Sequence, residues 1–143
     1  MPNTIQILMV EDNPGDVRLT KESLKNNGVK HVLYNVGDGV EALDFLFHRG
    51  SYANATRPDL IILDLNIPKK NGLEVLKEIK EDPSLRRIPV VVLTTSGARD
   101  DIMRSYDMHA NCYIIKSVNL DEFINIVRFV ESFWLGIVRL PKE

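Results

Sequence analysis

Three acidic residues follow two apolar segments that are typical of buried β-strands. Asp64 comes at the end of the run that begins at Ile61, and Glu11 and Asp12 come directly after the run from Ile5 to Val10. Such continuous runs indicate strands of a parallel sheet that is covered on both faces. If both strands lie in one parallel sheet, their carboxyl ends meet and the three carboxylates converge. Such a cluster can hold a hard cation and leave one oxygen free to react.

A hydroxyl and an ammonium group follow two further strand-like segments. Thr94 ends the run from Pro89, and Lys116 ends the run from Asn111. With the three acids, this set suits transfer of a phosphoryl group to a carboxylate. Mg²⁺ would offset the repulsion among the acids and neutralise charge on the phosphoryl group. Asp64 would be the nucleophile and would form a mixed anhydride, while the hydroxyl and the lysine bind the remaining phosphoryl oxygens.

Each of these residues also has an ordinary explanation. Glu11 and Asp12 could belong to a turn with a helix cap, and Asp64 could be a loop residue. Thr94 could be a β-branched strand residue, and Lys116 could be a solvated strand end. What favours a common site is that all of these residues fall at the ends of strand-like segments.

The elements that would position these residues alternate along the chain. The pattern predicts strands over residues 5–10, 31–36, 59–64, 89–94 and 111–116. It predicts helices from Pro14 to Gly28, from Asp38 to near Gly50, over 72–81, over 98–109, and from the cap Asn119 to about Val138, with a polar loop over 51–58. Five strands alternating with five helices indicate an α/β fold with a doubly wound parallel sheet.

Composition limits the class of protein further. The 143 residues suit a single domain over 1–143, and a hydrophobic content of 44% supports a core. A net charge of −2 gives no basic surface for nucleic acid. No apolar run reaches the length of about 18 residues that a membrane span needs, and the N-terminus lacks the features of a signal peptide. The single cysteine, Cys112, excludes an internal disulfide, suits the cytoplasm and is expected to be a buried, inert thiol.

The last predicted helix has more apolar surface than docking on a sheet requires. One stripe docks it on the sheet; its members are Leu120, Phe123, Val127, Val130 and Trp134. A second stripe lies beside it and consists of Ile126, Phe129, Phe133 and Ile137. The second stripe favours an apolar partner, which we expect to be a second copy of the chain; fuller packing on its own domain is the alternative.

With these residues, and with the turn from Pro68 to Gly72, the chain resembles the receiver domain of two-component response regulators. The resemblance covers essentially the whole chain and implies a flavodoxin-like fold with strand order 2-1-3-4-5. It implies that Asp64 accepts a phosphoryl group from a sensor histidine kinase, and that the protein is a phosphoacceptor with intrinsic phosphorylation and dephosphorylation chemistry rather than an enzyme. The implied Mg²⁺ ligands are Glu11, Asp12, Asp64 and the backbone carbonyl of Asn66. Thr94 and Lys116 would contact the phosphoryl group.

Two further positions bear on this resemblance. Tyr113 matches the family's switch aromatic, which turns inward as Thr94 moves toward the phosphate; a core tyrosine with its hydroxyl at the surface is the alternative. Ser117 departs from the family, which usually has a proline after the lysine. A cis bond before a residue other than proline costs about 3 kcal/mol, so this departure bears on the placement of Lys116.

A narrower resemblance is to stand-alone receivers paired with bacterial phytochromes. It is carried by residues 49–52, 64–68, 93–96 and the tail 133–141. It implies a phytochrome-like sensor kinase as partner and a homodimer formed through the last strand and helix. The output would be contact with a protein target, transfer of the phosphoryl group to another protein, or competition for the kinase. The resemblance identifies neither the kinase nor the target.

Three rival interpretations are weaker. A small phosphohydrolase with an aspartyl nucleophile would have a second Asp two residues after the nucleophile, where this chain has Asn66. A flavodoxin-like cofactor module would cradle a phosphate after the first strand, where Glu11 and Asp12 would repel it. A receiver without phosphorylation chemistry is disfavoured because no residue of the core site is missing.

Overall fold

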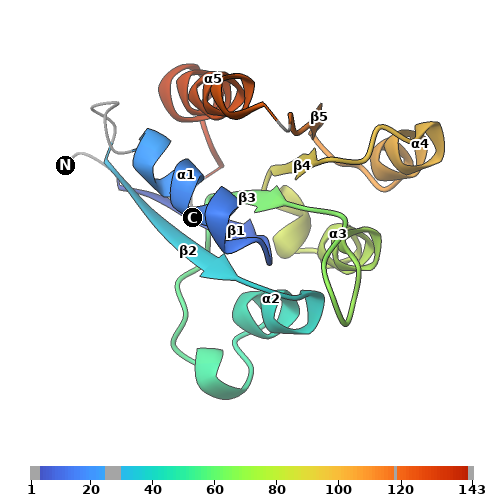
Figure 1. Ribbon diagram of the computed structural model, residues 1–143. Coiled ribbons are helices and arrows are strands. Elements are labelled where there is room, and N and C mark those ends of the chain that lie inside the picture. The colour runs from blue at the N-terminus through green and yellow to red at the C-terminus, as the bar shows by residue number, and fades with distance from the viewer. Residues whose placement is uncertain (1–3, 25–29, 118, 142–143) are drawn as a thin grey trace.

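A computed structural model describes residues 4–24, 30–117 and 119–141 of the chain. Within these residues, five strands alternate with five α-helices (Figure 1). In chain order they are β1 Ile5–Val10, α1 Pro14–Leu24, β2 His31–Val36, α2 Gly39–Leu46, β3 Leu60–Leu63, α3 Gly72–Glu81, β4 Val90–Thr94, α4 Arg99–Asp107, β5 Cys112–Ile115 and α5 Leu120–Val130. None of the described helices is both long enough and apolar enough to cross a membrane.

The five strands form one parallel sheet in the order β2-β1-β3-β4-β5. Helices α1 and α5 pack side by side on one face, and α2, α3 and α4 cover the other (Figure 1). The predicted α/β class, with a flavodoxin-like doubly wound sheet in the order 2-1-3-4-5, is therefore confirmed. In this arrangement all five strands end at one edge of the sheet.

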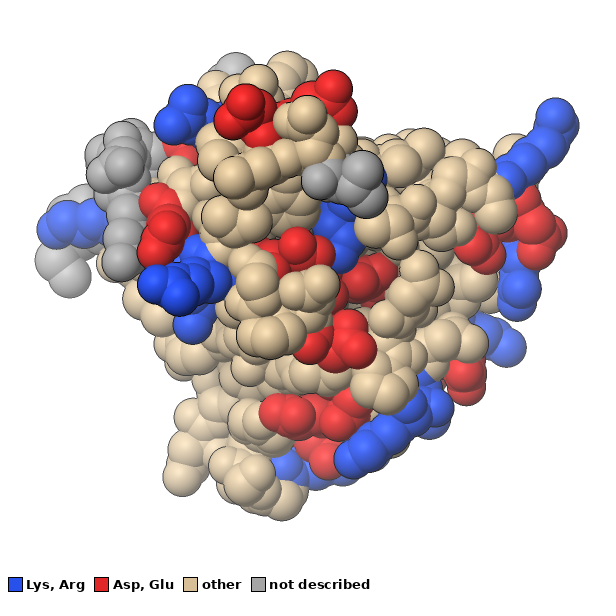
Figure 2. Space-filling model, viewed as in Figure 1, with Lys and Arg blue, Asp and Glu red and all other residues tan. Residues whose placement is uncertain are grey.

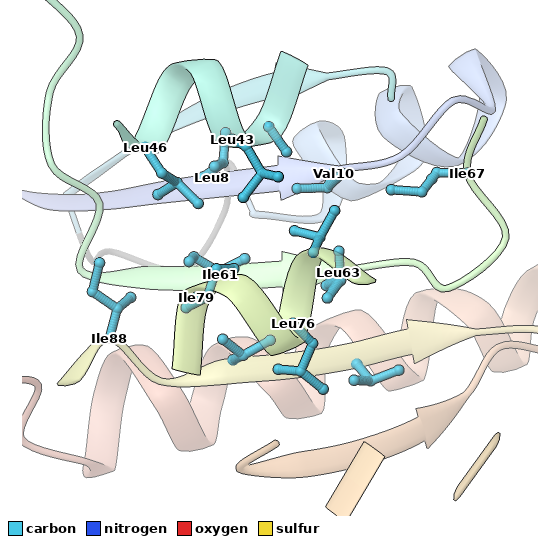
Figure 3. Packing of buried hydrophobic residues seen from close by; sticks show 14 of the residues in the cluster. Leu8, Val10, Leu43, Leu46, Ile61, Leu63, Ile67, Leu76, Ile79 and Ile88 are labelled. Carbon is cyan, nitrogen blue, oxygen red and sulfur yellow. The ribbon is translucent and has the colours of Figure 1, made fainter. Parts of the chain in front are cut away.

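Alternate residues of each strand enter two separate cores. Leu8 and Val10 of β1 pack with α2 and α3, whereas Ile7 and Met9 pack with α1 and α5. The strands β3 and β4 divide their side chains in the same way, and Figure 3 shows the core under α2 and α3. Because both faces are buried, β3 is apolar at every position, and β1 and β4 are apolar at every position except Gln6 and Thr94, which explains the nearly continuous runs in the sequence.

Polar side chains fix where several helices begin. Asp38 accepts a hydrogen bond from the N–H of Glu41, and Asn71 forms a reciprocal capping box with Glu74 at the start of α3. Gly72, the first residue of α3, lies so close to the backbone of Asp64 and Leu65 that a Cβ atom there would collide with it. The start of α3 is thus pressed against the turn that follows β3, where Asp64 lies.

The second helix ends earlier than predicted. It stops at Leu46 rather than near Gly50, because His48 and Gly50 adopt left-handed backbone conformations that interrupt helical winding. The expected polar loop begins with a 3₁₀ helix, Gly50–Tyr52, whose tyrosine ring packs against Phe45. The predicted end of the first helix at Gly28 lies outside the described residues, which follow α1 only to Leu24.

The C-terminal helix also differs from the prediction. Regular α-helix stops at Val130 and continues as a π-helical segment, Glu131–Ile137. The wider winding changes which side chains face inward, so Leu135 is buried while Trp134 is only half-buried. Leu120, a member of the predicted docking stripe, is exposed at the first position of the helix. The side chain of Ile137 lies outside the described part.

Candidate phosphoryl-acceptor site

The strand register brings three carboxylates together at one edge of the sheet. Val10 pairs with Leu63, and the Asp64 N–H donates to the carbonyl of Val10, so Glu11 and Asp64 follow neighbouring strands side by side. Glu11 is 2% exposed and Asp64 is 5% exposed, whereas Asp12 faces solvent. One carboxylate oxygen from each of Glu11, Asp12 and Asp64 lies within 4.8 Å of the others. Hard oxygen ligands at this spacing suit a divalent cation such as Mg²⁺.

Lys116 inserts its ammonium group among these acids. Its Nζ atom donates to Glu11 Oε1 at 2.6 Å and to Asp64 Oδ2 at 3.3 Å. A third bond, of 2.8 Å, goes to Asp16 Oδ2 on α1. Burial alone would lower the pKa of Lys116, but the bonds to Asp16 and Glu11 and the charge of Asp64 outweigh burial and raise the pKa above its usual value. The lysine is therefore a permanent positive charge at the centre of an acidic cluster.

Glu11 has an unusual electrostatic environment for a carboxylate. Burial raises its pKa to about 7, the negative charge of Asp64 adds to the shift, and the hydrogen bond from Lys116 opposes it. Its second oxygen, Oε2, accepts the N–H of Asn13 at 3.1 Å. A group with this pKa exchanges its proton near neutral pH, so a cation at this site would compete with a proton for Glu11.

The turn after β3 arranges the backbone around Asp64. The N–H of Asn66 donates to Asp64 Oδ1 at 3.0 Å, while Lys116 holds Oδ2. Asn66 therefore lies next to the carboxylates, as a ligand contributed through its backbone carbonyl would require. That role for the carbonyl remains a prediction.

Thr94 and Tyr113 lie on the neighbouring strands. Thr94 is fully buried at the end of β4, where its carbonyl accepts the N–H of Lys116 and its hydroxyl lies 3.4 Å from the N–H of Ser96. The ring of Tyr113 packs against the core beneath α2 and α3, and its hydroxyl donates to the carbonyl of Ser96 at 2.8 Å. The side chain of Ser96 in turn donates to Asp101 on α4. The loop after β4 thus links Thr94, Tyr113 and α4.

Ser117, the departure from the family pattern, has a local function in the structure. No cis peptide bond occurs among the described residues, so the Lys116–Ser117 bond is trans. The hydroxyl of Ser117 donates to Glu122 and accepts the N–H of Asn119, and Asn119 caps α5. These bonds fix the start of α5 directly after Lys116.

Asp16 was missed in the sequence. An acid in the first turn of a helix is common because it suits the helix dipole, so its type and position gave no reason to single it out. Its partner Lys116 is 100 residues away in the chain, and only the fold brings the two together. Figure 2 shows acidic side chains gathered over the middle of the molecule, where β1 and β3 lie.

Comparisons with known proteins agree with this geometry. Residues 7–128 match the model of the response regulator receiver domain family. The chain is 53% identical to the response regulator Rcp1 of Synechocystis sp. over 135 residues, which cover 94% of this chain and 92% of Rcp1.

Solved structures give the same result. The Mn²⁺-bound form of Rcp1 has a TM-score of 0.95 at 52% identity, covering 96% of this chain and 99% of the other. The phosphorylated cyanobacterial phytochrome response regulator RcpA also has a TM-score of 0.95, at 56% identity, with 98% of this chain and all of the other covered. The chain belongs to the response regulator receiver domain family of two-component systems, and it is similar to the phytochrome response regulators within it.

Proposed function

We propose that this protein is a stand-alone response regulator whose Asp64 accepts a phosphoryl group from a sensor histidine kinase. The observation that carries the proposal is the position of Asp64: it is buried at a strand end, beside Glu11 and Asp12 and in contact with the Lys116 ammonium. Aspartate is a weak nucleophile, and its negative charge repels the phosphoryl group that it would attack. A divalent cation on one side and the lysine on the other would offset this repulsion.

The residues present fit a divalent cation by their donor chemistry. Glu11, Asp12, Asp64 and the backbone carbonyl of Asn66 would hold Mg²⁺, which would neutralise charge on the phosphoryl oxygens. A structure of the related Rcp1 contains Mn²⁺, another divalent cation that prefers oxygen ligands. Thr94 and Lys116 would bind the remaining phosphoryl oxygens, with the Thr94 hydroxyl leaving the N–H of Ser96 to do so.

The output in this proposal is a change in a protein-binding surface. Tyr113 and Ser96 connect the loop after Thr94 to α4 and β5, so movement of Thr94 would alter that surface. The kinase partner would be phytochrome-like, as the similarity to RcpA and Rcp1 suggests, and we place the protein in the cytoplasm with such a kinase. The proposed partners do not include nucleic acid or a membrane.

We also propose that the protein forms a homodimer through β5 and the C-terminal helix. β5 is an edge strand of the described sheet. A groove of about 410 Å³ lies between β5 and this helix; Cys112, Ile114, Phe129, Phe133 and Trp134 are among its lining residues. Phe129 is 71% exposed. A second copy would offer the same strand and aromatic face, and twofold symmetry would cover both together.

The proposed acceptor role is tested by intact mass after incubation with acetyl phosphate and Mg²⁺. We expect one added phosphoryl group on the wild type and none on Asp64→Asn. Asp100→Asn is the matched control, because it makes the same chemical change at an exposed residue of α4. An Asp64→Asn protein phosphorylated to the wild-type level would contradict the assignment, and turnover of phosphomonoesters would favour a phosphohydrolase instead.

A further inference from the structure

The ammonium group of Lys116 has three N–H donors, and three carboxylates take them. Glu11 and Asp64 also belong to the cluster of oxygens suited to a cation, and Asp64 is the proposed phosphoryl acceptor. Asp16 belongs to neither set, since that cluster consists of Glu11, Asp12 and Asp64 among the described residues. Lys116 can therefore keep its bond to Asp16 when the oxygens of Glu11 and Asp64 bind a cation or the phosphoryl group.

The backbone of Asp16 is fixed on both sides. Asn13 Oδ1 accepts the N–H groups of Gly15 and Asp16, which caps the start of α1. The hydroxyl of Thr20 donates to the carbonyl of Asp16 one turn later. With α1 also packed against α5, the carboxylate of Asp16 projects from a fixed point beside the sheet edge.

The side chain of Lys116 is less constrained than its backbone. The carbonyl of Thr94 accepts the Lys116 N–H, and the bonds of Ser117 fix the chain that follows, but neither contact reaches the ammonium group. A long side chain with four rotatable bonds needs a partner to define its position. Its side chain is 4% exposed, and the carboxylate of Asp16 is 24% exposed, so the Lys116–Asp16 bond lies at the border of the buried site.

We propose that Asp16 is a positioning residue. Its carboxylate holds the Lys116 ammonium beside Asp64, where the ammonium can donate hydrogen bonds to the phosphoryl oxygens. The inference rests on the proposed role of Asp64 as acceptor. Asp16 itself touches no reacting atom and acts through Lys116. If Asp16 were only a favourable acid in the first turn of α1, its loss would affect helix stability and leave the chemistry of Asp64 unchanged.

The first test is a double-mutant cycle on the rate of phosphorylation by acetyl phosphate with saturating Mg²⁺. We expect Asp16→Asn to slow the reaction about tenfold, the effect of losing one charge-assisted hydrogen bond. In a Lys116→Met background the same substitution should change nothing, because the group that Asp16 positions is gone. Asp16→Glu keeps the carboxylate and should restore part of the rate.

The matched control is Glu22→Gln, which removes the same charge from an exposed position of α1 that pairs with Arg18. It should behave as the wild type. An unchanged rate in Asp16→Asn would overturn the proposal. Equal slowing in the presence and absence of Lys116 would also overturn it, since the effect would then be one of charge alone.

A second measurement separates this inference from the acceptor role. The ammonium ¹⁵N signal of Lys116 in Mg²⁺-saturated protein should be visible in the wild type and lost in Asp16→Asn, where the group exchanges with water. If no form of the protein takes up a phosphoryl group while the signal behaves in this way, the acceptor role fails and the anchoring stands. If the signal persists in Asp16→Asn, the anchoring is wrong whatever the phosphorylation result.

Discussion

At the scale of single residues, the site is a balance of buried charge. Glu11 and Asp64 are almost fully buried, and carboxylates in that position are tolerated only when they are paired or bound to a cation. Lys116 meets this need within the chain itself, because its ammonium contacts both acids. A divalent cation would take over part of that pairing, so metal binding would be coupled to the position of Lys116.

This coupling gives a prediction about pH. Because burial raises the pKa of Glu11 to about 7, a proton occupies this carboxylate below neutral pH and must leave before a cation can bind. Apparent Mg²⁺ affinity should therefore rise with pH, by about tenfold between pH 6 and pH 8 for a single group of this pKa. Isothermal titration calorimetry at a series of pH values measures the effect.

Glu11→Gln is the control for this prediction, since glutamine cannot take up the competing proton. Its Mg²⁺ affinity should be weaker and nearly constant over the same pH range. If the Glu11→Gln protein kept the wild-type pH slope, the titrating group would lie elsewhere. Asp12 is exposed and close by, so Asp12→Asn shows whether the slope belongs to Glu11 or to the cluster as a whole.

At the scale of elements, strand register decides which residues meet. The apolar runs indicated the strands and their polar ends. Five βα units indicate a parallel sheet, in which all strands run in the same direction and their carboxyl ends lie at one edge. The convergence of Glu11, Asp12 and Asp64 could thus be predicted from sequence. Asp16 could not, because its contact with Lys116 depends on how α1 is placed over the sheet relative to β5.

The misses at the ends of helices have a similar physical origin. Helical periodicity in the sequence continues through residues 131–137, but it does not distinguish α-helical from π-helical winding, and that difference placed Leu135 inside. The early end of α2 depends on the left-handed conformation of His48. Glycine commonly adopts this conformation, but histidine rarely does, so the residue type gave no sign of it. Neither feature is visible in the pattern of apolar residues along the element.

The contact between α3 and the turn after β3 gives a prediction about Gly72. A Cβ atom at this position would collide with the backbone of Asp64 and Leu65. Gly72→Ala should therefore lower the free energy of unfolding by about 2 kcal/mol, because strain from overpacking outweighs the entropic gain that alanine normally brings. It should also slow phosphorylation, since the turn that holds Asp64 must shift. Urea unfolding followed by circular dichroism measures the first effect.

Gly37→Ala is the matched control, because a Cβ atom at Gly37 would meet nothing within 4 Å and the backbone there is not left-handed. Its stability should stay within about 0.5 kcal/mol of the wild type. A Gly72→Ala protein more stable than the wild type would show that the turn after β3 can yield, and that the close approach of α3 does not position Asp64.

At the scale of the whole molecule, the exposed aromatic surface of the C-terminal helix lies apart from the proposed phosphoryl-acceptor site. The carboxylates lie where β1 and β3 end, whereas the exposed aromatic side chains of Phe129 and Phe133 lie on the C-terminal helix beside β5. Tyr113 belongs to β5, and its hydroxyl reaches the loop after Thr94. β5 therefore contributes both to the route from the site and to the proposed interface, so phosphorylation and assembly can influence one another.

The final prediction concerns this interface. Phe129→Glu places a charge on the exposed aromatic face and should convert a dimer into a monomer, because burying an unpaired carboxylate costs more than the contact gains. Sedimentation velocity at tens of micromolar protein, with and without acetyl phosphate, measures the change.

Val40→Glu is the control, since Val40 is an exposed valine on α2, on the opposite face of the sheet. A monomeric wild type in both conditions would refute the proposed interface, and loss of the dimer in Val40→Glu would place the interface on another surface. If only the phosphorylated wild type is a dimer, β5 carries the signal from Asp64 to the partner copy, and Tyr113→Phe should then weaken dimerisation without preventing phosphorylation.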